Sequence, residues 1–274
     1  MKKHNGILIY DDLCPLCTWY SNQFVRFNLL TAKNRVAFST ADPSLLRLID
    51  IEKGRNEIPY VDMESGKTFY GIYALLEILG QKLPIIKTIG NVQPVKWFLL
   101  RLYKLVSFNR KVIVAKKCGT GMFDCSPEFN FFYRILFMAI SLVFNTLMLF
   151  PLHNHVLSHL SYYHLTGMEL QLGHFSLVCI NCFLALNFGK EKAVQYLGQV
   201  SMLATISNLL LIPLLLLSFL KVNEILITIY FIGIAALIYK EYLKRMEYAG
   251  VLPENKWLVS LNLMSLTGFI LFLF

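Results

Sequence analysis

Charged side chains are scarce in the second half of this sequence. Of the 26 Lys/Arg and 17 Asp/Glu residues, only 8 and 6 fall within residues 131–274, whereas residues 1–130 carry 18 and 11. The mean hydropathy of +0.53 and the hydrophobic content of 56% exceed those of an average soluble protein. The composition therefore argues against a wholly soluble chain and predicts a soluble head, residues 1–130, joined to a membrane tail, residues 131–274.

Several motifs are absent, and each absence narrows the function. The sequence has no phosphate-cradling glycine motif and no Ser/His/Asp arrangement with recognisable spacing. It also shows no cleavable signal peptide, because the apolar run behind the basic start covers only Ile7 to Tyr10 before two aspartates. We therefore expect the head to stay on the side of the membrane where it is made. In a head that faces the cytosol, cysteines indicate catalysis or metal binding before structural disulfides.

Acidic residues are missing from one long stretch, between Ile78 and Phe123. Lysines and arginines occur throughout it, interleaved with aromatic and aliphatic side chains: Lys82, Lys87, Lys96, Arg101, Lys104, Arg110, Lys111, Lys116 and Lys117. A basic, aromatic helix beside a membrane span suits the anionic cytoplasmic leaflet. Nucleic acid would tolerate the same charge, but the adjacent tail favours the lipid bilayer as partner, and we expect no nucleic acid. Residues 91–130 are predicted to form a basic amphipathic connector.

The motif that points to chemistry lies near the N-terminus. An apolar run, Ile7 to Tyr10, is typical of a buried strand, and Cys14 and Cys17 follow it where a helix is predicted to begin. A helix N-terminus offers free N–H groups and partial positive charge, which favour the nucleophilic thiolate of Cys14. Cys17, one turn later, can reach the same mixed disulfide and resolve it. Because the first turn has no donor bond to lose, Pro15 is tolerated there. The spacing predicts a dithiol redox site.

Residues 6–80 are predicted to follow the order β-α-β-α-β-β-α. We expect strands at 6–11, 35–41, 58–63 and 67–70, and helices at 15–30, 43–51 and 71–79. Asp42 is placed to cap the second helix. This order belongs to the minimal thioredoxin fold, so we expect an α/β thioredoxin-like domain over residues 1–90. In that fold a cis proline opens the third strand and faces the active-site sulfurs, and Pro59 has that position.

The N-terminal segment resembles the DCC family of thiol-disulfide oxidoreductases, named for one aspartate and two cysteines. The similar motif reads Tyr10-Asp11-Asp12-Leu13-Cys14-Pro15-Leu16-Cys17, and further similar positions are Phe38 to Asp42, Gly66, Gly71 to Leu79, Tyr103, Asn109-Arg110 and Cys118. The resemblance covers roughly residues 5–125 and leaves the tail unexplained. Asp12 stands where the family usually has glycine. The resemblance implies thioredoxin-like disulfide exchange, and the likeness to thioredoxins suggests that Asp11 is a buried proton acceptor for Cys17.

The same residues also have plainer interpretations. Cys14 and Cys17 could be a buried pair or half of a zinc site, and Asp11 could cap the turn instead of accepting a proton. The glycine-bearing loop from Cys118 to Cys125 could hold a second dithiol, complete a four-cysteine metal site with Cys14 and Cys17, or be inert. The sequence leaves these alternatives open.

Five apolar runs of the tail have about the 20 residues that a bilayer requires. They are Phe131 to Leu152, Gln171 to Phe188, Leu197 to Leu220, Asn223 to Tyr239 and Trp257 to Phe274. We therefore expect an all-α polytopic membrane domain of about five transmembrane helices. Lysine and arginine alternate between the loops: 189–196 and 240–256 are basic, whereas 153–170 has neither residue. The positive-inside rule then predicts an integral protein of the bacterial inner membrane, with a cytoplasmic N-terminal domain and the C-terminus outside.

Two groups of residues interrupt the apolar tail. Cys179 and Cys182 lie three apart near the middle of the second predicted span, where they could form a secondary redox pair or pack as small side chains. Most of the histidines are clustered: His153, His155, His159, His164 and His174. On a helix, His155 and His159 would make a two-point metal or haem site, and Glu169 could add a carboxylate. Interfacial histidines that face water need no ligand.

The leading prediction is a membrane-anchored thiol-disulfide oxidoreductase. Cys14 attacks the disulfide of a protein or small molecule, Cys17 releases it, and Pro59 shapes the docking edge. The dithiol itself requires no cofactor. An extended version passes reducing equivalents through Cys179 and Cys182 to an outer acceptor. Two alternatives are a non-enzymatic membrane assembly subunit and a structural zinc module built on Cys14, Cys17, Cys118 and Cys125.

Overall fold

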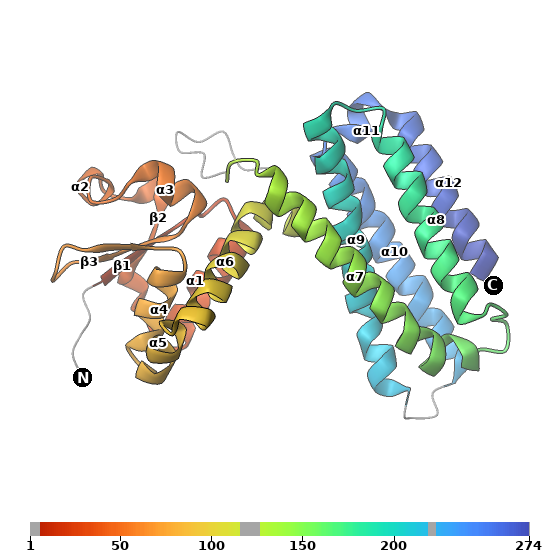
Figure 1. Cartoon of the computed structure of the whole chain (residues 1–274), viewed down its shortest axis with the longest axis horizontal. Coiled ribbons are helices and arrows are strands. Elements are labelled where there is room, and N and C mark those ends of the chain that lie inside the picture. The colour runs from red at the N-terminus through yellow and green to blue at the C-terminus, as the bar shows by residue number, and fades with distance from the viewer. Residues whose placement is uncertain (1–5, 116–126, 219–222, 274) are drawn as a thin grey trace. The chain divides into compact units, whose positions relative to one another are not determined.

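The computed structural model describes residues 6–115, 127–218 and 223–273, and Figure 1 shows the course of the chain. The predicted Cys118–Cys125 loop lies outside these residues. The chain divides into two compact units, Met1–Tyr133 and Arg134–Phe274. This division falls within three residues of the predicted boundary between head and tail. Each unit is described by itself.

The first unit is built on a four-stranded sheet. Its strands are β1 (Gly6–Tyr10), β2 (Arg35–Ala37), β3 (Pro59–Asp62) and β4 (Thr68–Tyr70), in the order β2-β1-β3-β4. β1 pairs with β2 in parallel, while the β1–β3 and β3–β4 pairs are antiparallel. The two central strands are therefore β1 and β3, and the carboxyl end of β1, which leads into the cysteine motif, lies inside the sheet and not at its edge.

Helices cover both faces of this sheet (Figure 1). Side chains alternate along a strand, so Leu8 and Tyr60 pack on one face and Ile9 and Val61 on the other. The first face packs against α1 (Pro15–Arg26), α4 (Ile72–Gly80) and α6 (Gln93–Ile113), and the second against the segment of α2 (Pro43–Leu46). The remaining helices of this unit are α3 (Ile51–Asn56) and α5 (Pro84–Gly90).

The predicted strands and helices are present, most of them with shorter bounds; the helix expected at 71–79 is Ile72–Gly80, and α3 was not predicted. The strand expected at 35–41 ends at Ala37 and continues as a 3₁₀ turn, Phe38–Thr40. The predicted cap is confirmed, because Asp42 Oδ1 accepts the Ser44 N–H at 2.7 Å. The helix expected at 15–30 ends at Arg26, since Asn28 takes a left-handed conformation with φ of 54°.

The expected cis bond before Pro59 is wrong, because among the described residues no peptide bond is cis. The Ile58 carbonyl, which belongs to that bond, accepts the Gly71 N–H at 2.9 Å, and Pro59 pairs with Tyr70 at the start of β3. A proline at the first residue of a strand removes no ladder bond that the sheet needs. This pairing accommodates the trans form that X–Pro bonds ordinarily prefer.

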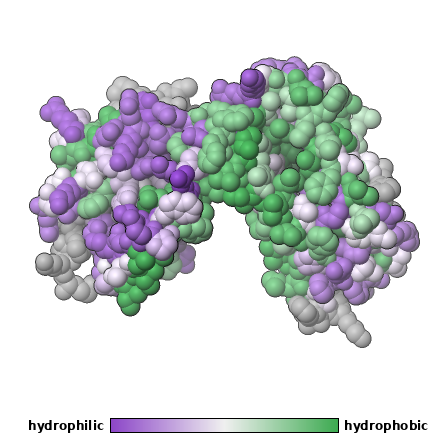
Figure 2. All heavy atoms as spheres, viewed as in Figure 1, coloured by the Kyte–Doolittle hydropathy of each residue, from purple (hydrophilic) through white to green (hydrophobic). Residues whose placement is uncertain are grey.

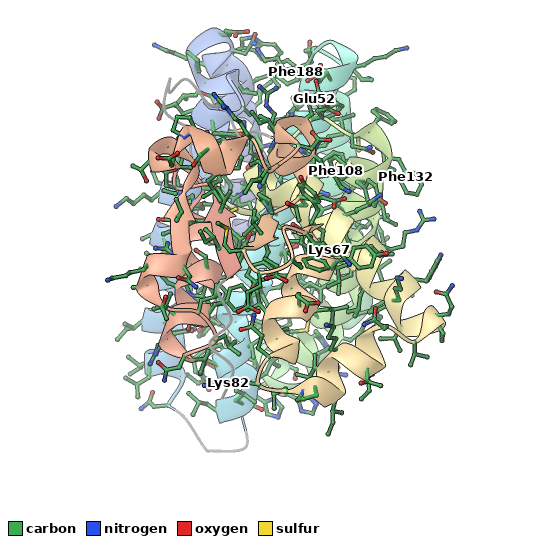
Figure 3. The ribbon with its side chains drawn as sticks, turned by 90° about the vertical axis from the view of Figure 1, so that its left-hand side faces the viewer. Glu52, Lys67, Lys82, Phe108, Phe132 and Phe188 are labelled. Atoms are coloured by element: carbon green, nitrogen blue, oxygen red, sulfur yellow. The ribbon has the colours of Figure 1, made fainter. Side chains whose placement is uncertain are left out.

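The predicted connector belongs to the first unit. α6 is held against the sheet by the Tyr103 hydroxyl, which accepts the Ile58 N–H at 2.9 Å, and by Ser107, which donates to the Asn56 carbonyl. Phe108 stacks on Tyr133 with ring centroids 5.2 Å apart, and Figure 3 marks Phe108 among the side chains of this region. α6 is thus a structural part of the head, and its last turns approach the cysteine motif.

The second unit is helical. Its helices are α7 (Phe131–His155), the 3₁₀ turn η3 (Leu157–His159), α8 (Gly167–Ala185), α9 (Lys190–Leu217), α10 (Glu224–Tyr248), α11 (Val251–Glu254) and α12 (Lys256–Leu273). Within the described chain, four helical segments are long and apolar enough to cross a membrane: Phe131–His159, Gly167–Ala185, Lys190–Leu217 and Glu224–Tyr248. The fifth expected span corresponds to α12, which is not among these four.

Large apolar side chains lie on the outside of this unit. Val143 is 59% exposed, Leu147 60% and Ile232 64%, although all three are in long helices. Figure 2 shows the apolar colouring over the exposed face of these helices. A soluble protein rarely leaves so large an apolar surface in water, whereas a bilayer solvates it. The second unit is therefore suited to a membrane.

Replacing Tyr103 tests how α6 is held. In Tyr103→Phe the buried Ile58 N–H loses its acceptor, at an expected cost of about 1–3 kcal/mol. We expect the thermal unfolding of the full chain, followed by near-ultraviolet circular dichroism, to shift to lower temperature by several degrees. Tyr73→Phe, in a side chain that is 38% exposed, is the matched control. Equal midpoints for the two variants would show that the Tyr103 bond contributes nothing.

Candidate functional site

The cysteine motif lies where β1 ends and α1 begins. Cys14 is the N-cap residue of α1, with φ −94° and ψ 110°, and Pro15 opens the first turn. The Cys14 sulfur accepts the Cys17 N–H at 3.4 Å. Both cysteines are buried, with Cys14 at 7% exposure and Cys17 at 3%, and neither forms a disulfide in this structure. The predicted strand–CxxC–helix arrangement is confirmed.

The surroundings of Cys14 favour its thiolate. A hydrogen bond from the Cys17 thiol, the Cys17 N–H and the charge of Arg110 lower the pKa of Cys14 to about 6, against the opposing effects of burial and of Asp11. At neutral pH the group is therefore mostly ionised. The thiolate is the form that attacks disulfides, so Cys14 has the environment expected of a nucleophile.

Cys17 has the opposite character. Its hydrogen bond to Cys14 and its burial raise the pKa of the Cys17 thiol well above the ordinary value. Tyr20, one turn later, also hydrogen-bonds the Cys17 side chain, and burial raises the pKa of that phenol. Cys17 therefore stays protonated while Cys14 is a thiolate, and the two sulfurs share one proton between unequal positions.

Arg110 is the functional residue whose role sequence reasoning missed. It reaches the motif from α6, with Nη1 at 3.6 Å from the Cys17 sulfur and Nη2 at 3.9 Å from Asp11 Oδ2. A further bond from Nη2 to the Arg55 carbonyl, at 2.7 Å, fixes the guanidinium. From the sequence, Arg110 was one basic residue of the predicted connector and, with Asn109, a position of family resemblance. Because these residues follow Cys17 by more than 90 positions, no local pattern in the sequence predicts that Arg110 lies beside the cysteines.

Arg110 is buried, and its charge matters because of its neighbours. Burial lowers the pKa of the guanidinium, but its electrostatic interactions with Cys17, Cys14 and Asp11 outweigh burial and raise that pKa overall. The cation is therefore stable in a nearly dry place because the Cys14 thiolate and the Asp11 carboxyl lie near it. In return it stabilises negative charge on either sulfur.

Asp11 caps the turn, which is one of its two predicted roles. It also lies close enough to the cysteines for the other role, that of a proton acceptor for Cys17. Its Oδ1 accepts the Leu13 N–H at 3.0 Å, which is the turn-capping bond. Burial raises the pKa of the carboxyl, while Arg110 and the N–H groups of Leu13 and Cys14 act in the opposite direction. A buried carboxyl with a raised pKa within 4.8 Å of the sulfur ligand atoms can exchange a proton with them.

Asp12, which departs from the family glycine, holds the motif against the next segment of the chain. Its carboxylate accepts the Ser39 hydroxyl at 2.8 Å and the Ser39 N–H at 3.4 Å. Ser39 lies in the 3₁₀ turn that follows β2. The departure therefore has a structural role, and it leaves the cysteines in position.

Metal binding by this motif has geometric support in part. Asp11, Cys14 and Cys17 place one ligand atom each within 4.8 Å of the others. Cys118 and Cys125, which would complete a four-cysteine site, lie outside the described residues. The Arg110 guanidinium already supplies positive charge beside these three groups, and a second cation would be repelled by it.

The histidine cluster is not assembled as expected. α7 ends at His155, and His159 lies in the separate turn η3, so the two do not share one helical face. Glu169 accepts the Thr166 N–H and hydroxyl as part of a capping box at the start of α8. Within residues 127–218, which include every predicted ligand of this group, no three ligand side chains come together. The prediction required His155 and His159 to be one turn apart on the same helix, but α7 ends at His155.

Cys179 and Cys182 lie in the C-terminal half of α8 as free thiols. Both are exposed on the isolated unit, and Cys182 also lines a cavity between the helices. Exposure on an apolar surface is compatible with packing against lipid or with a redox role. A redox role stays a prediction.

Comparisons of the chain with protein-family models, with curated proteins and with solved structures found no match.

The pH dependence of alkylation tests the Cys14 environment. Because only the thiolate reacts, a pKa lowered to about 6 predicts that the rate with iodoacetamide rises as pH increases through about 6 and then levels off near neutrality. An ordinary thiol would keep gaining reactivity up to about pH 8.5. Peptide mapping identifies the alkylated cysteine, and Cys14→Ser is the control that removes the signal. A rate still climbing above pH 8 would contradict the assignment.

Arg110→Met tests the role of the guanidinium. Without its charge the pKa of Cys14 rises, and an increase of about one unit would slow alkylation near pH 6 about fivefold. Arg110→Lys, which keeps the charge, should retain more of the rate. Arg101→Met is the matched control on the same helix, since Arg101 lies over Trp97 and away from the motif. Unchanged kinetics in Arg110→Met would exclude an electrostatic role.

Proposed function

We propose that the chain is a membrane-anchored thiol-disulfide oxidoreductase with a thioredoxin-like head, similar to the DCC family. The observation that carries the proposal is the pairing of a low-pKa Cys14 at the start of α1 with a protonated Cys17 beside Arg110. The sheet order β2-β1-β3-β4, with helices on both faces, supports the interpretation of the head as a thioredoxin-like fold. No other described group in the first unit combines a nucleophile with this environment.

The reaction follows from the two unequal thiols. The Cys14 thiolate attacks one sulfur of a substrate disulfide, forming a mixed disulfide and expelling the other substrate sulfur as a thiolate. Cys17 then loses its proton and attacks the Cys14 sulfur, which releases the second substrate thiol. The substrate disulfide gains two electrons and the Cys14–Cys17 pair becomes a disulfide. A separate dithiol reductant must return the pair to its reduced form.

Two side chains assist these steps: Asp11 by accepting a proton and Arg110 by stabilising negative charge on sulfur. Asp11, with a raised pKa and buried beside the sulfurs, accepts the proton that Cys17 gives up. Arg110 keeps its charge throughout and stabilises whichever sulfur is anionic. Pro59 at the start of β3 remains the proposed docking edge for the substrate, in its trans form.

The membrane unit anchors the head, and its orientation is part of the proposal. The alternation of basic and neutral loops supports a cytoplasmic head in a bacterial inner membrane with the C-terminus outside. The substrate is then a protein or small-molecule disulfide on the cytoplasmic side. A relay through Cys179 and Cys182 would need mobile partners on both sides of the bilayer.

A zinc module is the second candidate, because three ligand atoms of the motif lie within 4.8 Å. It differs from the first candidate in a measurable way. A zinc site holds the metal in a fixed ratio and shows no turnover, whereas the dithiol is active without metal. The position of Arg110 favours the dithiol.

Trapping the mixed disulfide tests the proposal directly. Cys17→Ser cannot resolve the intermediate, so we expect a covalent adduct between Cys14 and its substrate that dithiothreitol releases. Non-reducing gels and mass spectrometry of the membrane fraction detect the adduct and name the substrate. Cys14→Ser should give none, and Cys182→Ser should behave as the wild type. If Cys14→Ser forms as much adduct as Cys17→Ser, the proposal is wrong.

A further inference from the structure

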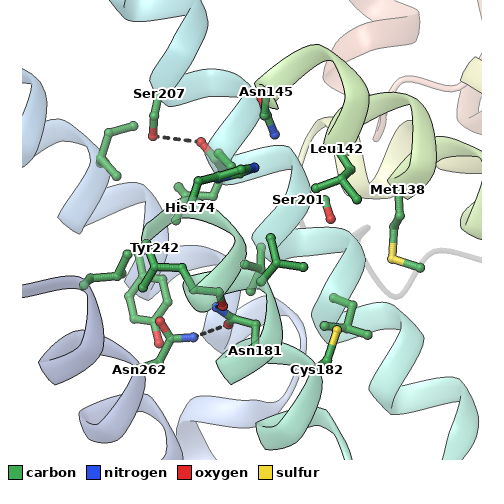
Figure 4. A pocket seen from close by; sticks show the side chains of 18 of the residues that line it. Met138, Leu142, Asn145, His174, Asn181, Cys182, Ser201, Ser207, Tyr242 and Asn262 are labelled. Atoms are coloured by element: carbon green, nitrogen blue, oxygen red, sulfur yellow. Dashed lines mark hydrogen bonds between the residues drawn. The ribbon is translucent and has the colours of Figure 1, made fainter. Parts of the chain in front are cut away.

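The second unit contains a partly open cavity of about 350 Å³ among its helices (Figure 4). Its walls come from α7, α8, α9, α10 and α12, and they are mainly aliphatic, with Met138, Leu142 and Leu177 among them. None of the described residues that line it is Asp, Glu, Lys or Arg. The volume lies at the lower end of the range for small-molecule pockets. A charged molecule would lose its hydration there without gaining a counter-charge, so the cavity suits an uncharged molecule.

Most polar side chains at this cavity are satisfied by other protein groups. Asn262 donates to Asn181 and to the Tyr196 hydroxyl, and Asn208 donates to Asn145 at 2.9 Å. Ser207 donates to the carbonyl one turn before it in α9. These side chains form a fixed polar framework, and Figure 4 marks the Asn181–Asn262 and Ser207 bonds with dashed lines.

His174 is the exception. Its Nε2 atom is buried, and among the described residues it has no hydrogen-bond partner. The ring extends from α8 among the lining side chains and, in the view of Figure 4, lies between Asn145 and the Asn181–Asn262 pair. Buried polar atoms are nearly always paired, so an unpartnered nitrogen on an imidazole that lines an apolar cavity indicates a missing partner.

We propose that this cavity binds an uncharged, lipophilic molecule through one oxygen atom that pairs with His174 Nε2. The aliphatic walls solvate the body of the ligand, and a carbonyl or hydroxyl oxygen supplies the hydrogen bond that His174 lacks. The bilayer delivers such a ligand, since it dissolves in hydrocarbon. The site is independent of the dithiol chemistry of the first unit.

The oxygen-to-imidazole bond separates this proposal from simple filling by a lipid chain. A hydrocarbon chain would occupy the same apolar space but would leave Nε2 unpaired. A ligand that carries the oxygen should therefore bind better than its hydrocarbon analogue. One net hydrogen bond corresponds to about three- to tenfold in affinity.

Photolabelling of the full chain in lipid nanodiscs tests the proposal, with benzophenone as the probe. On irradiation the excited ketone takes a hydrogen atom from a nearby C–H bond, and the two radicals join, so the carbonyl becomes a hydroxyl and a C–C bond forms. We expect labelled peptides to contain Met138, Leu142 or Leu177. Labels spread over lipid-facing residues such as Leu147 and Ile232 would overturn the proposal.

Competition distinguishes the oxygen-bearing ligand from a lipid chain. Dicyclohexyl ketone should suppress the labelling about three- to tenfold more effectively than dicyclohexylmethane, in which a CH2 group replaces the carbonyl. Equal suppression by the two compounds overturns the proposal, because it means that the cavity accepts any hydrocarbon.

Variants assign the preference to His174. His174→Phe should abolish the advantage of the ketone over the hydrocarbon, and His174→Gln, which keeps a hydrogen-bonding group, should restore part of it. His164→Phe is the matched control, since this histidine is exposed and does not line the cavity. A ketone advantage that survives in His174→Phe refutes the assignment. If His174→Phe does not fold, His174→Gln and the wild-type competition still decide.

Discussion

The charge of Arg110 beside the two cysteines is the constraint on which the first unit depends. A buried guanidinium needs anionic neighbours, and a buried thiolate needs a cation or N–H donors, so each makes the other tolerable. The 3.6 Å approach to Cys17 and the bond to the Arg55 carbonyl require α6 to pack in one position. Two hydrogen bonds with the segment before β3 hold α6 there: the Tyr103 hydroxyl accepts the Ile58 N–H, and Ser107 donates to the Asn56 carbonyl. The chemistry of a motif near the N-terminus thus depends on a helix that ends almost a hundred residues later.

The two units differ in where their apolar side chains lie. The first buries an apolar sheet, and among its described residues the buried charged side chains, Asp11 and Arg110, lie at the cysteine motif. The second exposes its apolar side chains and keeps amides and hydroxyls inside, where they bond to one another. A bilayer explains that inversion, since lipid solvates the outside and cannot satisfy a polar group. Unpaired polar atoms such as His174 Nε2 are informative in this setting because water is not there to satisfy them.

Local patterns predicted most of the elements. The strand–CxxC–helix reading followed from an apolar run, a proline and the cysteine spacing, and the Asp42 cap followed from one side chain, because these features depend on neighbours in sequence. Features that depend on contacts between residues far apart in the sequence could not be predicted from local patterns. Arg110 looked like one more basic residue of a connector, and nothing local distinguishes it from the exposed Arg101. The trans bond before Pro59 and the break between His155 and His159 depend on how the backbone turns, which residue spacing does not specify.

We propose that Cys14 and Cys17 form a reversible two-electron couple without metal. The most direct measurement equilibrates the full chain, in nanodiscs and free of metal, with glutathione buffers of stepped potential, and counts the modified thiols of the Cys14–Cys17 peptide by mass spectrometry. We expect a single reversible transition in which both thiols disappear together, and we expect Cys14→Ser to abolish it. Thiols that stay reduced across the series, or that are protected by a zinc ion bound in a fixed ratio, would contradict it.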